Sequence, residues 1–115
     1  MLETRREEQG EVLVLRLAGD IDEDGAKVLR VELLRCLKAQ QVQIILDMGR
    51  VGLVSYLGLG VLVERLRQFR AGGGDIKLVR VNLATERLLR MAGISRLFES
   101  YENDHRAVQV YQKAA

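Results

Sequence analysis

The chain has 115 residues, of which 48% are hydrophobic and 30% are charged, and its formal net charge at pH 7 is +2. This length and composition are typical of one soluble globular domain and exclude an intrinsically disordered chain. The 18 basic residues nearly balance the 16 acidic ones, so the composition gives no reason to expect a nucleic-acid partner.

Several features concern the compartment in which the chain would work. No apolar run approaches the length that crosses a bilayer, so we expect no membrane insertion. The segment Met1–Glu8 lacks the apolar centre of a signal peptide. The single cysteine, Cys36, excludes an intramolecular disulfide and fits a reducing environment. We therefore expect a cytoplasmic protein.

The first third of the chain predicts two strands and a helix. Glu3–Glu8 is polar and predicts an edge strand, whereas the apolar run Val12–Ala18 predicts a central strand. A helical stripe with spacings of three and four then comprises Ala26, Leu29, Leu33, Cys36 and Leu37. The acidic residues Asp22, Glu23 and Asp24 precede this stripe and suit a helix N-terminus.

The middle of the chain repeats the pattern. Val42–Leu46 predicts a strand that ends at Asp47. A second helical stripe follows, with Glu64, Arg65, Arg67 and Gln68 left for solvent, and it comprises Leu59, Leu62, Val63, Leu66 and Phe69. Three glycines, Gly72–Gly74, are expected to end this helix and turn the chain.

The last third adds two strands and two helices. The strands are predicted at Ile76–Val81 and Leu97–Tyr101. The helices are predicted through Leu88, Leu89 and Met91 as far as Gly93, and through Ala107, Val108 and Tyr111. The order β-β-α-β-α-β-α-β-α predicts an α/β fold, one domain over residues 1–115, with about four helices on a mixed, mostly parallel sheet and the first strand at its edge.

Residues that could support catalysis are scarce. The only histidine, His105, stands beside Asn103 and Asp104 at the expected start of the last helix. Cys36 lies on an apolar stripe and is interpreted as a packing thiol. No metal-ligand spacing is present. We therefore predict that the chain is not an enzyme and holds neither a metal nor a cofactor.

Glycine and arginine patterns also fail to predict a nucleotide or nucleic-acid site. The run Gly58–Val63 begins like a dinucleotide fingerprint but has valine in place of the third glycine, and no phosphate-binding loop follows. Arg65, Arg67 and Arg70 are spread around a helix instead of forming one patch. Asp20 and Asp22 flank Ile21 in a turn, where they could be structural turn and cap residues or an acidic rim that a partner recognises.

Several local patterns, taken in order, resemble the STAS domain, the family that includes bacterial anti-sigma factor antagonists. Gly19–Asp22 is similar to the family's turn after the second strand, and Gly58–Leu62 is similar to the start of its second helix. Leu88–Phe98 resembles the third helix and its following turn, and Asp104–Val108 resembles the start of the last helix. The resemblance covers nearly the whole chain and implies the same fold.

The resemblance implies a regulator of bacterial transcription that acts by binding an anti-sigma factor, often an ATP-dependent serine kinase. In the family that kinase phosphorylates a serine or threonine just before the glycine that here is Gly58, and the added charge breaks the complex. The matching residue in this chain is Leu57, which has no hydroxyl group. Phosphorylation at the usual position is therefore not expected, whereas Ser55 could be a displaced acceptor or a helix cap.

We favour a STAS regulator whose binding is not controlled by loop phosphorylation. Tyr56 and Leu57 would then be exposed apolar anchors of the contact, with Asp20, Asp22, Ser55 and Gly58 in the same partner-binding surface. The alternative is a structural STAS subunit of a larger assembly, such as a stressosome-like particle or a lipid-transport ABC complex. The sequence leaves oligomerisation and the identity of the partner open.

Overall fold

The computed structural model describes residues 1–114 of the chain. Its single sheet has five strands in the spatial order β1-β2-β3-β4-β5. The strands are β1 (Glu3–Gln9), β2 (Val12–Ile21), β3 (Gln43–Val54), β4 (Asp75–Val79) and β5 (Ser100–Tyr101). β1 is antiparallel to β2, and every later pair is parallel. The predicted mixed sheet with the first strand at its edge is confirmed.

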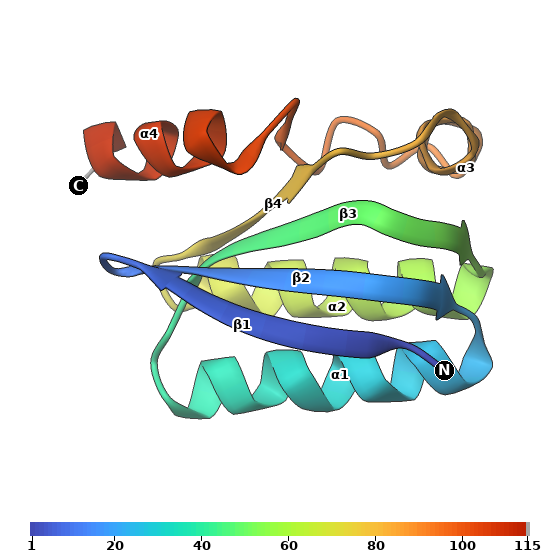
Figure 1. Ribbon diagram of the computed structural model, residues 1–115, viewed down its shortest axis with the longest axis horizontal. Helices are drawn as coiled ribbons and strands as arrows, with labels where there is room; N and C mark the ends of the chain where they lie inside the picture. The colour runs from blue at the N-terminus through green and yellow to red at the C-terminus, as the bar shows by residue number, and fades with distance from the viewer. Residues whose placement is uncertain (115) are drawn as a thin grey trace.

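Four helices connect or follow the strands within the described residues. They are α1 (Glu23–Lys38), α2 (Tyr56–Ala71), α3 (Leu83–Met91) and α4 (Asp104–Ala114). Figure 1 shows α1 and α2 side by side on one face of the sheet, with α3 and α4 on the other side of it. The element order agrees with the predicted one. No helix in residues 1–114 is long and apolar enough to cross a membrane.

The alternation of side chains along β2 builds two apolar clusters. Leu13, Leu15 and Leu17 are buried in the larger cluster, to which α1 and α2 contribute most of the helical residues. Val12 and Val14 point the other way and pack in a smaller cluster with α4. Both faces of β2 are therefore covered over its first half, as its nearly continuous apolar sequence predicts.

Tyr111 of α4 anchors this helix to the sheet through its hydroxyl group. The hydroxyl accepts from the N–H of Ile44 at 3.1 Å and lies 2.7 Å from the carbonyl oxygens of Ile44 and Asp75. The ammonium group of Lys77 stands 4.5 Å from the centre of the Tyr111 ring. It also donates to Asp75 and Glu99, at 2.9 Å each, so this buried cation is paired.

Several element boundaries differ from the prediction. β3 does not end at Asp47 but continues through Gly49 and Gly52 to Val54, because it stays paired with β2 beyond an irregularity in register. The last strand, predicted from Leu97, contains only Ser100–Tyr101.

The prediction that Arg65 faces solvent is wrong. Arg65 is only 6% exposed and lies between α1 and α2. Its guanidinium group donates to the carbonyl of Arg30 at 3.2 Å and to the side chain of Gln68 at 2.7 Å. The long aliphatic stem of arginine fits an apolar helix interface while its head finds polar partners. Met91 lies in the third helix, as predicted, and is 79% exposed.

Candidate partner-binding site

The residues predicted to bind a partner gather where β2 and β3 end and where α1 and α2 begin. We call this part of the sheet the carboxyl edge. It comprises the six predicted residues Asp20, Asp22, Ser55, Tyr56, Leu57 and Gly58, and two residues that were not predicted, Leu53 and Leu83. In parallel sheets the loops at this edge are the usual binding surface. The structure therefore brings all six predicted site residues together, although their contact with a partner stays a prediction.

Both aspartates of the turn have structural partners. Asp22 is the N-cap of α1, and its carboxylate accepts from the N–H of Gly25 at 2.8 Å. The carboxylate of Asp20 accepts from the N–H of Leu53 at 3.0 Å and so joins the ends of β2 and β3. The structural interpretation of this pair is confirmed, and both residues remain exposed to a partner.

Ser55 caps α2 and is tied to the same turn. Its hydroxyl accepts from the N–H of Gly58 at 3.1 Å, and its own N–H donates to the carbonyl of Ile21 at 2.9 Å. Gly58 is buried, and a Cβ at this position would lie 2.7 Å from the Cγ2 atom of Ile21. The start of α2 is therefore fixed against β2, which sets the direction in which the two residues between Ser55 and Gly58 project.

Those two residues, Tyr56 and Leu57, are the exposed apolar side chains of the first turn of α2. Tyr56 is 72% exposed and Leu57 is 50% exposed. Because Ser55 already caps the helix, its hydroxyl group is held in a backbone hydrogen bond. Leu57 has no hydroxyl group and offers only an apolar surface.

Two further exposed leucines extend this surface and were missed by the sequence analysis. Leu53 is near the end of β3, and Leu83 is the first residue of α3. The side chain of Asn82, the N-cap of α3, accepts from Thr85 and donates to the carbonyl of Val51 at 3.0 Å. This contact brings the start of α3 to the carboxyl edge. The sequence offered one indication of this position, because the apolar Leu83 directly follows Asn82, a residue type that favours helix N-caps.

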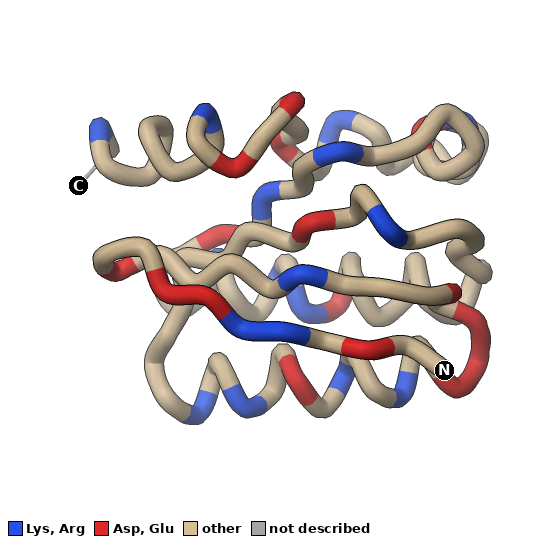
Figure 2. The backbone as a smooth tube through the Cα atoms, in the orientation of Figure 1, with Lys and Arg blue, Asp and Glu red and all other residues tan. Residues whose placement is uncertain are grey.

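The charge around this apolar surface is acidic on one side. Figure 2 shows the connection from β2 into α1 as a red segment, and it contains Asp20, Asp22, Glu23 and Asp24. The acidic residues in the first turn of α1 also face the positive end of the helix dipole. The carboxyl edge thus offers an apolar centre beside a negative margin, an arrangement that suits a partner with an apolar pocket next to basic residues.

The residues considered for catalysis lie elsewhere. Cys36 is buried in α1, and burial raises the pKa of its thiol, which disfavours the reactive thiolate. His105 lies exposed in the first turn of α4. Within residues 1–114 no group of His, Cys, Asp and Glu is arranged to hold a metal ion.

Comparison with known proteins places this arrangement in a family. The model of the STAS domain matches residues 3–107, which include every residue of the carboxyl edge. The chain belongs to the STAS domain family. This membership agrees with the observed element order.

Individual relatives agree with the family. An anti-sigma F factor antagonist of Paenibacillus polymyxa is 27% identical over 108 residues, which is 93% of this chain and 92% of the relative. Among solved structures, a Thermotoga maritima protein provisionally described as an anti-sigma factor antagonist is similar with a TM-score of 0.87, 21% identity and 92% coverage of both chains. An anti-sigma factor antagonist of Mycobacterium paratuberculosis has a TM-score of 0.85 at 21% identity, over 96% of this chain and 93% of that one.

Proposed function

We propose that this STAS chain is a cytoplasmic regulator of bacterial transcription that binds an anti-sigma factor through the carboxyl edge. The observation that carries the proposal is the pair of exposed apolar side chains, Tyr56 and Leu57, on a helix start that Ser55 and Gly58 hold rigid. Apolar and aromatic side chains presented on a fixed scaffold gain most from burial at a contact. The name of the Paenibacillus polymyxa relative supports the same activity.

The regulation we propose differs from phosphorylation at the usual loop position. Leu57 cannot accept a phosphate, and its side chain is positioned to be part of the contact itself. Ser55 would have to give up or reshape its cap to be modified, although a phosphate at a helix N-terminus is electrostatically favourable. The bound fraction of this chain would then be set by partner abundance and not by a phosphate on residue 57.

Calorimetry with the purified chain and each anti-sigma factor of the host tests this proposal. Saturable binding to one of them is the expected result. Absence of binding to all of them, with the chain shown to be folded, would overturn the sigma pathway. Mass spectrometry of the chain isolated from its host tests the second part, because it shows directly whether Ser55 or Tyr56 carries a phosphate.

One observation favours the alternative of a structural subunit in a larger assembly. α1 exposes two apolar side chains, Val31 and Leu34, on a surface that does not belong to the carboxyl edge. A second apolar surface suits a subunit that contacts more than one neighbour. Purification of the tagged chain from native extract separates the two functions, since an assembly subunit brings stoichiometric STAS or transporter subunits and an antagonist brings an anti-sigma factor.

A further inference from the structure

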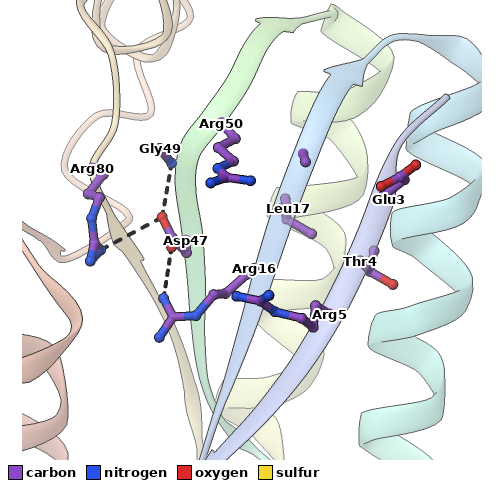
Figure 3. Close-up of a pocket in the computed structure, with 10 residues that line it drawn as sticks. Glu3, Thr4, Arg5, Arg16, Leu17, Asp47, Gly49, Arg50 and Arg80 are labelled. Atoms are coloured by element: carbon purple, nitrogen blue, oxygen red, sulfur yellow. Dashed lines mark hydrogen bonds and ion pairs between the residues drawn. The ribbon is translucent and has the colours of Figure 1, made fainter.

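A separate surface lies on the face of the sheet that packs on α4, over the part of this face that α4 does not cover. It is a depression of about 670 Å³ formed by β1, β2, β3 and the residue that follows β4. Figure 3 shows the charged side chains that line it, and they are Glu3, Arg5, Arg16, Asp47, Arg50 and Arg80. The volume is that of a site for a small molecule. None of these residues belongs to the carboxyl edge.

A bulge in β3 brings Arg50 to this depression. Asp47 pairs with Arg16 and Arg50 pairs with Ala18, so β3 has one residue more than β2 between the two pairs. Side chains alternate between the faces of a strand, and Arg50, three residues after Asp47, would otherwise point to the opposite face, which packs on α1 and α2. The extra residue turns Arg50 to the same face as Asp47, as bulges beside binding sites commonly do.

A second departure from regular backbone places Arg80. This residue follows β4 with φ of 56°, in the left-handed region that non-glycine residues rarely adopt. Its side chain passes over Gly49, where an added Cβ would lie 3.0 Å from the Arg80 Cδ atom. The left-handed backbone and the glycine together allow a guanidinium group to stand at the border of the depression.

The arginines of the depression fall into two kinds. Arg16 and Arg80 are held in ion pairs, with the Arg16–Asp47 pair at 2.8 Å and the Arg80–Asp104 pair at 2.8 Å. Arg5 and Arg50 have no ion pair or side-chain hydrogen bond with any residue in the described range 1–114. Arg5 and Arg50 come from β1 and β3, the two strands that flank β2, and Figure 3 shows the Arg5 side chain extending from β1 over β2. The paired arginines form a fixed border, and the unpaired ones are available to a ligand.

The chemistry of the unpaired groups identifies the class of ligand. A guanidinium group binds the oxygen atoms of a carboxylate or a phosphate with two parallel hydrogen bonds. Ala18, on β2 between the strands that carry Arg5 and Arg50, is small and leaves room above the sheet. Glu3, which pairs with Ala18 across the strands, offers an acceptor for a hydroxyl or amino group of the same molecule.

We propose that this depression binds a small organic anion whose carboxylate or phosphate group lies between Arg5 and Arg50. The site is independent of partner binding at the carboxyl edge, so its failure would leave the proposed function intact. The bulge that places Arg50 and the left-handed residue Arg80 each carry a conformational cost. A ligand site explains why both irregularities meet at one depression.

Titrations of the full chain followed by NMR test the proposal, with amide and arginine Nε–H signals as the readout. The probes are inorganic phosphate and citrate, each added at constant ionic strength with sodium chloride as the reference. We expect saturable shifts at residues 47–50 and at the Nε–H groups of Arg5 and Arg50. Saturation by phosphate alone assigns a phosphate group, by citrate alone a carboxylate, and by both an oxyanion site that accepts either.

Variants distinguish a site from general attraction of anions to positive charge. Arg5→Gln and Arg50→Gln should each weaken the binding about tenfold, since each removes a charge-assisted contact. Arg67→Gln is the matched control, because Arg67 is an exposed arginine on α2, which packs on the other face of the sheet. Its affinity should stay within about twofold of the parent chain, as expected for a distant screened charge. Absence of saturation with both probes, or equal losses in all three folded variants, would overturn the proposal.

Discussion

Gly58 at the start of α2 lies against Ile21 at the end of β2. A Cβ on Gly58 would stand 2.7 Å from the Ile21 Cγ2 atom and 3.0 Å from the Ile21 carbonyl oxygen. The same carbonyl accepts the N–H of Ser55 at 2.9 Å. Ile21 thus fixes the position of both the N-cap and the first turn of α2, and this turn presents Tyr56 and Leu57.

This contact predicts that alanine has opposite effects on stability at two glycines of the same helix, Gly58 and Gly60. Gly58→Ala should lower the free energy of unfolding by about 2 kcal/mol, because the added methyl group has no space. Gly60 is the matched control in the same helix, since an added Cβ meets no atom within 4 Å. Gly60→Ala should raise the free energy of unfolding by about 0.5–1 kcal/mol through helix propensity. Urea unfolding measures both, and equal effects of the two substitutions would contradict the close packing.

The cap of α2 predicts how Ser55 variants behave. Ser55→Ala should lower the free energy of unfolding by about 1 kcal/mol, because the N–H of Gly58 loses its acceptor. Ser55→Asp should retain most of the stability, since aspartate is an equally good N-cap. Thermal unfolding of the two variants checks this. If Ser55→Ala is as stable as the parent chain, the serine side chain does not stabilise the start of α2.

The buried position of Arg65 predicts that removing its charge costs little stability if the side chain keeps its length. Its Nε atom is buried without a hydrogen-bond partner in the described residues. Arg65→Met keeps the length of the stem and removes the buried polar head, so the free energy of unfolding should change by less than about 1 kcal/mol. Arg65→Ala should cost about 2 kcal/mol because the stem is lost as well. Chemical denaturation distinguishes the two, and a large loss in the methionine variant would show that the head group is the stabilising part.

Glu99 predicts a pH dependence of stability. The hydrogen bond from Lys77 lowers the pKa of the Glu99 carboxyl below its ordinary value. A carboxyl group with a lower pKa in the folded state stabilises the fold above its unfolded pKa, about 4.3, and this contribution disappears as the pH falls through the folded pKa. The difference in unfolding free energy between the parent chain and Glu99→Gln should therefore shrink from pH 6 to pH 3. A difference that stays constant over this range would contradict the ion pair.

Periodic apolar residues were sufficient to predict the order of elements and the sheet, because each stripe or run had one face to bury. Cap residues likewise located the starts of α1 and α2, since Asp22 and Ser55 each precede a helix and supply a side-chain oxygen. The sequence could not show that β3 passes through Gly49 and Gly52, because glycine is as typical of a turn as of a bulge.

The position of single side chains was harder to predict than the elements. Arg65 is buried because the α1–α2 interface supplies polar partners beside apolar side chains, and one of these partners, the carbonyl of Arg30, comes from a helix more than thirty positions away in the chain. Leu83 joins the carboxyl edge only through the tertiary contact between Asn82 and β3. Arg50 reaches the depression through a change in register. Such placements depend on packing between elements and leave no periodic signal in the sequence.

The affinity of Leu57→Asp for the anti-sigma partner, measured by calorimetry beside Met91→Asp, tests the central claim most directly. Both substitutions place a charge on an exposed apolar position, but only Leu57 lies at the carboxyl edge, whereas Met91 ends α3. We predict that Leu57→Asp weakens the complex by more than about 1 kcal/mol, or roughly fivefold, and that Met91→Asp leaves it unchanged. Unchanged affinity of Leu57→Asp would remove this loop from the interface and contradict the proposed function.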